Sequence, residues 1–388
     1  MKIKNYQTGV VSLPREAGPL TGGLGDGKSS TSDFVTIKIQ SEDGTTGIGY
    51  AGFTSSVMLK PLKVTIDELL ELIINQDSER IDAITNNLYS IAGAGAPAGL
   101  LTRAIAGIDV ALWDLKGKFL NQPIYKLLGG SHNKVRTYAS GYLWRNFDLD
   151  RLQKKASELI EEGYDAMKFR MGGESSNAKE IERMKIMREA VGPEVTLMVD
   201  VNQGWDVNTS ITIGRKLEEF DLYWLEDPVY HQDYAGLSRI AETLDLPIAN
   251  GEYHYGIEPF KTLIDHKSVD IVLIDLLRAG GISQWMKIAH LAEINNMKVA
   301  SHLATEVLLH CVAASKNGLW VEHMPWTFEM FEEEPVVKDG YMILPDGPGI
   351  GVNFNESAYQ YSANATVLAA GKVTVDLLNP NFFLNKSA

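Results

Sequence analysis

The sequence predicts an α/β fold, a (β/α)8-type (TIM-like) barrel preceded by an N-terminal α+β capping domain. The chain has 388 residues, more than a single hydrophobic core usually serves, so two domains are expected. A strand-and-turn pattern opens the chain, and after Gly130 short apolar runs alternate regularly with helical stretches. Such alternation is typical of parallel strands joined by helices.

The capping domain is predicted over residues 1–125. Residues 34–40 alternate between apolar and polar, Asp43-Gly44 supplies a turn, and residues 46–50 return, which is a hairpin pattern. Apolar residues then recur every three or four positions over 62–89 and 100–120, so this region is predicted to be helical. Pro123 and Gly129-Gly130 end it.

The catalytic barrel is predicted over residues 126–363. Eight strands alternating with helices fit one closed parallel barrel, and a doubly wound open sheet is the alternative. Residues 364–388 are expected to pack back on the capping domain. The expected strands are 135–140, 166–171, 196–201, 223–225, 247–250, 271–274, 298–300 and 319–321.

Composition and charge limit the partners of this chain. Its content of 45% hydrophobic and 22% charged residues is that of a globular protein. A net charge of −14 and a pI of about 5.1 argue against nucleic acid and anionic membranes, whereas a small anionic substrate stays compatible. Cys311 is the only cysteine, which excludes an internal disulfide. With no signal peptide or membrane-spanning stretch in the sequence, we expect a cytoplasmic location.

Three carboxylates close consecutive predicted strands: Asp200, Glu226 and Glu252, each 26 residues after the last. In a closed barrel these strand ends are neighbours at the carboxyl-terminal mouth, where barrel enzymes place their active sites. Three close carboxylates repel one another unless a cation neutralises them, and hard oxygen ligands favour Mg²⁺ over Zn²⁺. The alternative is that each residue only caps the following helix, which explains three at equal spacing poorly.

Polar residues also end the second, sixth, seventh and eighth strands in the same register. Lys168 and Arg170 are two positions apart, so both side chains should point into the barrel. Asp275, His302 and Glu322 end the sixth, seventh and eighth strands. A lone buried histidine is more often structural, but a carboxylate on the adjacent strand would fix the tautomer of His302 and raise its basicity.

Together these residues resemble the mandelate racemase subgroup of the enolase superfamily over most of the chain. The matching segments are AGIDVALWDLKGKFLNQPIYKLLGG (106–130), KFRMG (168–172), VDVNQ (199–203), WLEDPV (224–229), GE (251–252), the pair Asp275 and His302, and Glu322. The resemblance implies one Mg²⁺ per subunit on the three carboxylates, a small-molecule carboxylate as substrate, and a homo-oligomer up to the size of an octamer.

The resemblance also implies catalytic roles that agree with the chemistry of removing a proton next to a carboxylate. His302, oriented by Asp275, is expected to be the acid/base, and Lys168 to add positive charge to the substrate oxygens. Mg²⁺ is expected to stabilise the enediolate that develops. Glu322, if kept protonated, would donate a hydrogen bond to this intermediate. Asn202 is expected to contact a substrate hydroxyl.

Arg170 departs from the Lys-x-Lys pattern that much of this subgroup has on the second barrel strand. A guanidinium stays protonated near neutral pH, so it is a poor base but a good clamp for oxygen atoms. His302 is then the well-placed base, which favours a dehydratase (a hydro-lyase) that converts an aldonic or aldaric acid into a 2-keto-3-deoxy acid. A racemase, epimerase or cycloisomerase using the same enediolate is the alternative, and a non-catalytic protein on an inherited barrel is a third.

Residues 22–29 (GGLGDGKS) satisfy the P-loop pattern but lack its context. Pro14 and Pro19 precede the motif and a β-rich segment follows, whereas a P-loop needs a strand before it and a helix after it. We interpret the segment as a capping loop over the barrel mouth, with Arg15 or Lys28 able to meet a distal substrate carboxylate. His254 and Trp144, both just beyond strand ends, are further candidates for the substrate pocket.

Overall fold

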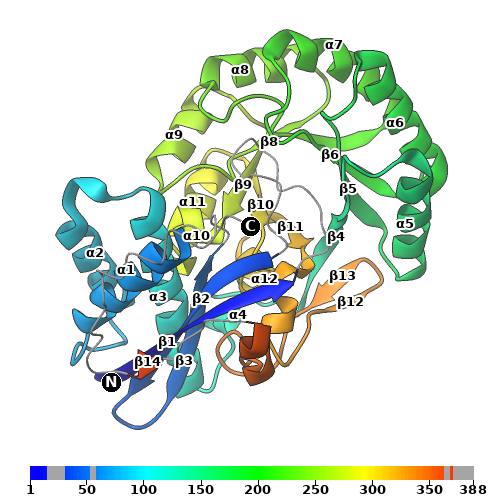
Figure 1. Cartoon of the computed structure of the whole chain (residues 1–388). Coiled ribbons are helices and arrows are strands. Elements are labelled where there is room, and N and C mark those ends of the chain that lie inside the picture. The colour runs from blue at the N-terminus through cyan, green and yellow to red at the C-terminus, as the bar shows by residue number, and fades with distance from the viewer. Residues whose placement is uncertain (15–30, 53–57, 362–367, 370–388) are drawn as a thin grey trace, which may run out of the picture.

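The computed structural model describes residues 1–14, 31–52, 58–361 and 368–369 (Figure 1). It contains a closed parallel barrel beside a separate antiparallel sheet with its own helices, so the predicted fold class is confirmed. Within these ranges, none of the helices has both the length and the apolar character that crossing a membrane requires.

The capping part of the molecule begins with an antiparallel sheet in the order β14-β1-β2-β3. Its strands are β1 (Ile3–Pro14), β2 (Thr31–Ser41), β3 (Thr46–Gly52) and the two-residue β14 (Leu368–Ala369). The predicted hairpin is confirmed as β2 and β3, which pair from Phe34–Gly52 to Gln40–Thr46. The short β14 brings a segment near the end of the chain onto β1.

Three helices follow: α1 (Leu59–Glu71), α2 (Ile81–Ala92) and α3 (Gly99–Phe119). The stretch 62–89 is therefore two helices, separated by residues 72–80. In that break Asn75 has a left-handed φ of 65°, a conformation that cannot continue a right-handed helix.

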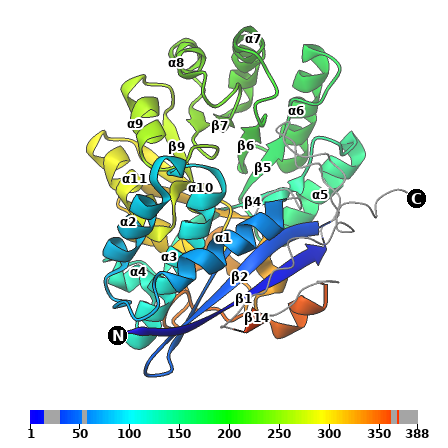
Figure 2. The same cartoon turned by 60° about the vertical axis from the view of Figure 1, so that its left-hand side comes forward.

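Helix α3 joins the capping sheet to the barrel. It packs against β3, and it also contacts α10 (Leu276–Ala279) and α11 (Ile282–Ile294) of the barrel (Figure 2). Gly47 and Gly49 permit the contact with β3, because a Cβ atom on either would collide with the backbone of α3. The capping part is thereby held close to the sixth βα unit of the barrel.

Eight parallel strands form the barrel, and pairing of β11 with β4 closes it. Closure excludes the doubly wound open sheet. The strands are β4 (Lys134–Leu143), β5 (Ala166–Arg170), β6 (Thr196–Asp200), β7 (Leu222–Glu226), β8 (Ile248–Asn250), β9 (Ile271–Asp275), β10 (Lys298–His302) and β11 (Gly318–His323).

Helices surround the barrel on the outside (Figure 1). Besides α10 and α11 they are α5 (Leu149–Glu161), α6 (Asn177–Val191), α7 (Val207–Leu217), α8 (Tyr234–Thr243), α9 (Glu258–Asp265) and α12 (Thr305–Ala314). The short α4 (Ile124–Leu127) precedes the barrel, and the 3-10 helix η4 (Pro325–Met330) follows its last strand. Strands β12 (Val336–Lys338) and β13 (Tyr341–Ile343) form a hairpin that pairs antiparallel with β4.

The barrel interior has an apolar layer directly below its polar mouth. Met198, Trp224, Leu273, Ala300 and Trp320 belong to one buried cluster inside the barrel. Each lies two positions before the polar residue that ends or nearly ends its strand, so the two-residue period of a strand points both side chains inward. The apolar layer excludes water from below, and the polar layer above it forms the candidate site.

Candidate active site

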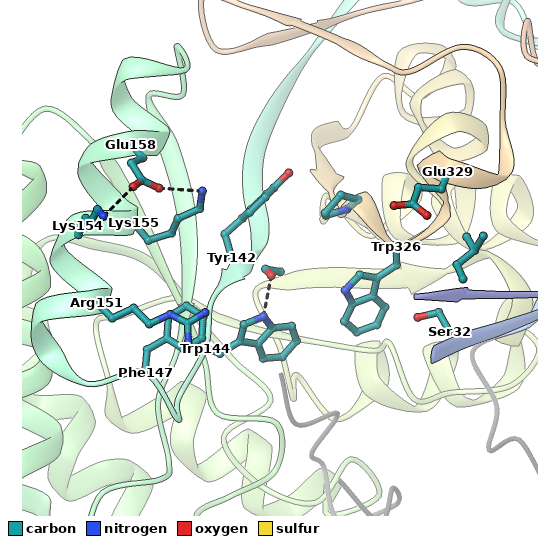
Figure 3. A pocket seen from close by; sticks show the side chains of 13 residues that line it. Ser32, Tyr142, Trp144, Phe147, Arg151, Lys154, Lys155, Glu158, Trp326 and Glu329 are labelled. Carbon is teal, nitrogen blue, oxygen red and sulfur yellow. Dashed lines mark hydrogen bonds and ion pairs between the residues drawn. The ribbon is translucent and has the colours of Figure 1, made fainter. Parts of the chain in front are cut away.

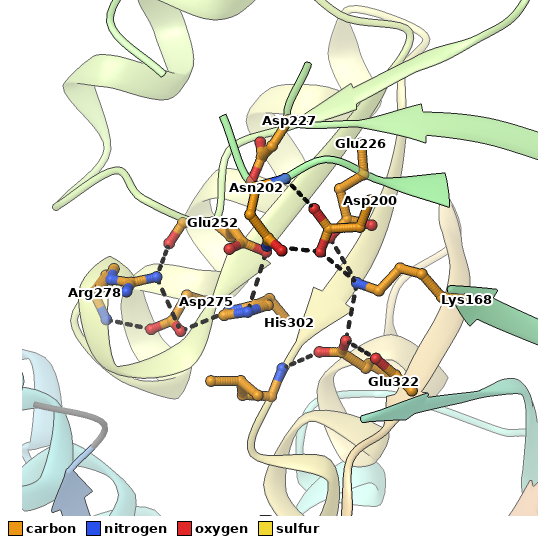
Figure 4. A network of polar contacts seen from close by, with 12 residues as sticks. Lys168, Asp200, Asn202, Glu226, Asp227, Glu252, Asp275, Arg278, His302 and Glu322 are labelled. Atoms are coloured by element: carbon orange, nitrogen blue, oxygen red, sulfur yellow. Dashed lines mark hydrogen bonds and ion pairs between the residues drawn. The ribbon is translucent and has the colours of Figure 1, made fainter. Parts of the chain in front are cut away.

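The polar strand ends converge in one buried network at the carboxyl-terminal mouth of the barrel (Figure 4). Lys168, Arg170, Asp275, His302 and Glu322 are each at most 8% exposed. The three predicted metal ligands, Asp200, Glu226 and Glu252, are at most 3% exposed. Burial of so many charges together is unfavourable unless each has partners, so the contacts within the network decide its chemistry.

The three strand-end carboxylates do not cap the helices that follow them. The N-caps of α7, α8 and α9 are Asp206, Asp233 and Ile257 instead. The capping alternative therefore fails for these three positions. Asp275 does cap the short α10, and its other carboxylate oxygen contacts His302.

Asp227 is a fourth carboxylate of the cluster, and the sequence analysis missed it. Oxygens of Asp200, Glu226 and Asp227 lie within 4.8 Å of one another. A strand continuing past Glu226 would turn the next side chain away, but Asp227 has a left-handed φ of 45° that keeps it at the site. It accepts a hydrogen bond from Asn250 Nδ2, and burial followed by the charge of Glu252 raises its pKa well above the usual value.

Glu252 reaches the cluster through an irregular strand end. Gly251 has a φ of 139°, and a Cβ atom there would collide with the carbonyl oxygen of Leu273. The turn at Gly251 brings Glu252 Oε2 to 3.1 Å from His302 Nε2. Glu252 also raises the pKa of Glu226, after the larger effect of burial. Its carboxylate therefore borders both the carboxylate cluster and the histidine.

Lys168 is the cation nearest the centre of the cluster. Its side chain is 1% exposed, and Nζ lies 2.6 Å from Glu226 Oε1, 3.0 Å from Glu322 Oε1 and 3.9 Å from Asp200 Oδ2. Burial alone would lower the pKa of Lys168, but Glu226 and Glu322 raise it well above the ordinary value. Lys168 thus stays protonated and supplies fixed positive charge.

Arg170 lies beside Asp200 and against an aromatic ring. Its Nε is 3.1 Å from Asp200 Oδ2, and its guanidinium lies 5.1 Å from the ring centre of Trp144. Burial would lower the pKa of Arg170, but Asp200 raises it further above its already high value. Arg170 cannot act as a base under these conditions, in agreement with the sequence-based argument.

His302 is held between two carboxylates. Its Nδ1 lies 2.8 Å from Asp275 Oδ2, and its Nε2 faces Glu252. Burial would lower the pKa of the imidazole, but Glu252 and then Asp275 raise it above 6.5. Asp275 fixes the ring through Nδ1, so Nε2 is the nitrogen left to exchange a proton at the mouth.

Arg278 holds Asp275 in place and was not foreseen from the sequence. Its backbone N–H donates to Asp275 Oδ1 at 2.7 Å, and its Nη1 donates to the carbonyl oxygen of Glu252 at 2.7 Å. Burial would raise the pKa of Asp275, but Arg278 and the bond to His302 lower it below the usual value. Asp275 is therefore ionised near neutral pH and presents a negative charge to His302.

The contacts of Glu322 do not favour the protonated form on which its role as a donor depends. Glu322 accepts hydrogen bonds from Ser140 Oγ at 2.7 Å and from the backbone N–H of Leu303 at 2.6 Å. Burial would raise its pKa, but Lys168 and His302 lower it to about 2. An ionised Glu322 is an acceptor and an ion-pair partner for Lys168, so it cannot donate to an intermediate.

Of the predicted substrate-binding residues, Asn202 is hydrogen-bonded to the carboxylate network and His254 is buried. Asn202 Nδ2 donates to Asp200 Oδ2 at 2.9 Å, and its Oδ1 accepts from Arg145, a half-buried cation in the loop after β4. His254 is buried at 3% exposure, and burial lowers its pKa to about 3, so it is neutral. Arg15 and Lys28 lie outside the described residues.

The donor set fits Mg²⁺. Asp200, Glu226, Asp227 and Glu252 offer only carboxylate oxygens, the ligand type that Mg²⁺ prefers. Within the described part of the chain, the buried Asp227 Oδ2 and Asn250 Oδ1 have no hydrogen-bond donor. Buried acceptors without donors are rare, and a cation would satisfy them.

Comparison with known proteins agrees with this chemistry. Residues 10–129 match the family described as "Mandelate racemase / muconate lactonizing enzyme, N-terminal domain", and residues 151–358 match "Enolase C-terminal domain-like". L-talarate/galactarate dehydratase of Salmonella typhimurium is 34% identical over 329 residues, covering 85% of this chain and 82% of the relative. A 3,6-anhydro-alpha-L-galactonate cycloisomerase of Streptomyces coelicolor is 30% identical, with 82% of this chain and 88% of the relative covered.

A solved structure shows the same architecture with ligands bound. L-Talarate dehydratase from Polaromonas sp. JS666, complexed with Mg and L-glucarate, superposes with a TM-score of 0.87 at 29% identity. The match covers 95% of this chain and 99% of that one. The similarity therefore extends through both the capping part and the barrel.

Proposed function

Because this chain belongs to the mandelate racemase/muconate lactonizing enzyme family of the enolase superfamily, we propose that it is a Mg²⁺-dependent dehydratase of an acid sugar. The substrate is an aldonic or aldaric acid and the product a 2-keto-3-deoxy acid. One observation carries the proposal. His302, oriented by Asp275, is the base of the site, whereas Arg170 on the second barrel strand stays protonated and cannot act as a second base.

We assign the metal site to Asp200, Glu226 and Glu252, with one Mg²⁺ per subunit. In this structure the carboxylate oxygens that lie within 4.8 Å of one another belong to Asp200, Glu226 and Asp227, and Asn250 holds Asp227 beside the first two. A bound Mg²⁺ would supply positive charge to the substrate carboxylate and so favour the negative charge that develops there. The all-oxygen donor set supports Mg²⁺, and the unpartnered oxygen of Asp227 supports a cation in this cluster.

The chain's own residues account for the proton transfers. His302 Nε2 removes the proton on the carbon next to the carboxylate, while Asp275 stabilises the resulting imidazolium. Lys168 places a positive charge beside the oxygens that gain electron density. The β-hydroxyl then leaves with a proton from the imidazolium, and the enol tautomerises to the keto acid. Arg170 clamps an oxygen and Glu322 fixes Lys168.

An assay for 2-keto acid across a panel of aldonic and aldaric acids with Mg²⁺ tests the proposal. Wild-type protein should form keto acid from at least one member, and Asp200→Asn should form none because its metal site is impaired. If wild-type protein binds Mg²⁺ yet no member of a broad panel yields keto acid, the dehydratase proposal is refuted.

A cycloisomerase or epimerase is the second candidate, favoured by the cycloisomerase among the relatives. Both activities share removal of the same proton. Proton NMR in D₂O separates them, because dehydration removes a hydroxyl whereas epimerisation exchanges the proton and keeps every hydroxyl.

A further inference from the structure

The capping part and the barrel border a recess beside the end of β4 (Figure 3). Trp144 and Trp326 line it with parallel rings whose centres are 5.9 Å apart, and α5 contributes lysines to its wall. These lysines are paired with carboxylates: Lys155, for example, lies 3.1 Å from Glu158 and 3.9 Å from Glu162. A second contact between the two parts, near the loops after β8 and β9, is closed and differs in its chemistry.

At this second contact the capping helix α3 places a buried cation, Arg103, against the barrel. Arg103 is 4% exposed. Its Nη1 donates to the carbonyl oxygen of Gly52 at 2.6 Å, and its Nε donates to the hydroxyl of Tyr255 at 3.1 Å. Gly52 ends β3 of the capping sheet, whereas Tyr255 lies in the turn after β8. One planar guanidinium thus bridges the two parts of the molecule.

The turn that Arg103 contacts is itself bonded to Arg278. The backbone N–H of Gly256 donates to the carbonyl oxygen of Arg278 at 3.1 Å, and the Arg278 guanidinium lies 4.9 Å from the ring centre of Tyr253. A Cβ atom on Gly256 would lie 2.7 Å from Cγ of Pro97, two residues before α3. Gly256 therefore permits close contact between the capping part and this turn.

Arg278 connects the turn to the proposed base (Figure 4). Its backbone N–H donates to Asp275 and its Nη1 donates to the carbonyl oxygen of Glu252, both at 2.7 Å. Asp275 in turn lies 2.8 Å from Nδ1 of His302. Burial lowers the pKa of Arg103, Arg278 adds to this effect and Asp275 is among the groups that oppose it, so these three charges act on one another.

We propose that Arg103 is a positioning residue for the pair Asp275 and His302, and that it acts through Tyr255 and Arg278. The capping part then contributes to proton transfer although Arg103 does not touch the reacting atoms. A shift of Arg278 would move Asp275 relative to the ring nitrogen that it holds, and a misplacement of about 1 Å can reduce a rate by roughly 10²-fold. The inference rests on the proposed function, since it takes His302 to be the base.

Two substitutions loosen this bridge while keeping its charge. Arg103→Lys retains a cation but cannot direct several donors in one plane, and Tyr255→Phe removes only the accepting hydroxyl. With an acid sugar that the wild-type protein converts, each should lower kcat about tenfold, whereas KM should stay within about twofold. This separation is expected because neither residue is assigned to the metal or to the substrate.

NMR of the His302 ring measures the same effect without turnover. The probe is the full chain loaded with Mg²⁺ alone and labelled at histidine with the heavy nitrogen isotope, and His302→Asn assigns the signals. At a pH where the ring is neutral, the wild type should carry its proton on Nδ1. In Arg103→Lys and Tyr255→Phe the nitrogen shifts should move toward the average of the two tautomers, because the bond to Asp275 that selects one tautomer is weakened.

Ser283→Ala is the matched control. Ser283 also joins α3 to the barrel, through bonds to Asp109 at 2.5 Å and from Trp113 at 2.9 Å, and neither bond involves the turn after β8. This variant should keep the wild-type kcat and the wild-type His302 signals, even where its unfolding midpoint falls.

The inference is overturned if Arg103→Lys and Tyr255→Phe both fold and keep the wild-type kcat or the wild-type His302 signals. Equal changes in Ser283→Ala would also overturn it, because any loosening of the interface would then have the same effect. Altered His302 signals in both variants of a protein whose wild type converts no acid sugar would instead refute the dehydratase and leave the positioning role of Arg103 standing.

Discussion

Replacing Lys168 by methionine is expected to make the stability of this protein depend strongly on Mg²⁺. Methionine keeps the volume of the buried stem but removes the ammonium, which lies 2.6 Å from Glu226 and 3.0 Å from Glu322. The carboxylates that surround it then lose their buried positive partner. When metal is absent, they must either stay charged in a poorly solvated site or take up protons.

The size of the effect follows from the burial of the partners. Lys168 is 1% exposed and both carboxylates are fully buried, so removing one partner costs about 3–5 kcal/mol in the metal-free protein. For a domain of this size such a loss lowers the unfolding midpoint by roughly 10 °C. Because a bound divalent cation restores positive charge to Glu226, Mg²⁺ should raise the midpoint of Lys168→Met more than that of the wild type.

Thermal unfolding followed by circular dichroism, with EDTA and with excess Mg²⁺, measures both quantities. Lys287→Met is the control, because Lys287 pairs with Asp82 at 2.8 Å on the surface, where such a pair contributes less than about 1 kcal/mol, and its partner is no proposed metal ligand. The reasoning is refuted if Lys168→Met in EDTA unfolds at the wild-type temperature, or if Mg²⁺ stabilises both proteins equally.

Three further predictions follow from the network and from the core. The Mg²⁺ affinity measured by calorimetry should fall roughly 100-fold or more in Glu252→Gln but only about tenfold in Asp227→Asn, because we assign Asp227 to a supporting position. A larger loss of affinity in Asp227→Asn than in Glu252→Gln would make Asp227 the ligand and Glu252 the supporting residue. The pKa of His302 is raised above its usual value and only the neutral imidazole is a base, so kcat/KM should rise with pH through that pKa. Asp275→Asn should shift this rise to lower pH and reduce kcat/KM at least about tenfold, because Asp275 helps to raise the pKa of His302. An unmoved pH profile in Asp275→Asn would contradict the pairing of His302 with Asp275. Asp109 lies buried on α3 and accepts hydrogen bonds from the backbone N–H and the hydroxyl of Ser283. Burial raises the pKa of Asp109 to about 7, so the folded state holds a proton that the unfolded state releases near pH 4. Stability against urea should therefore fall between pH 4 and 7 by a term on the order of 4 kcal/mol, which Asp109→Asn should abolish, and an equal slope in both proteins would count against it.

The strand-end residues of the site could be predicted because one geometric rule controls them. In a barrel strand, alternate side chains point inward, so an apolar residue such as Met198 and the polar residue two positions later, Asp200, must face the same interior. The regular 26-residue spacing then places successive strand ends side by side. Pairing of Asp275 with His302 follows from the same rule, since β9 and β10 are neighbours in register.

Residues outside the strands could not be predicted in the same way. Asp227 is in the cluster only because its backbone adopts a left-handed φ, which a sequence pattern does not reveal for an aspartate. Arg278 contributes through a backbone N–H as well as through its side chain, and Arg145 contributes from a loop. The adjacency of Asp227 to Glu226 was the one signal in the sequence.

The charge state of Glu322 also lay beyond the sequence. A carboxylate at a strand end can be protonated or ionised depending on contacts of a few ångströms. Here Lys168 at 3.0 Å and two hydrogen-bond donors favour the ionised form over the neutral form that burial alone would favour. Likewise, apolar periodicity continues on both sides of the break between α1 and α2, which contains the left-handed Asn75.

The central claim is that His302 removes the proton next to a substrate carboxylate held at the barrel mouth. Proton NMR in D₂O with Mg²⁺ and an acid sugar that the wild-type protein converts tests it most directly, by following that single proton. We predict that wild-type protein replaces or removes the proton with loss of water, and that His302→Asn slows its loss by roughly 10²–10⁴-fold while still binding Mg²⁺. Undiminished loss of the proton in a folded, Mg²⁺-binding His302→Asn protein would contradict the account.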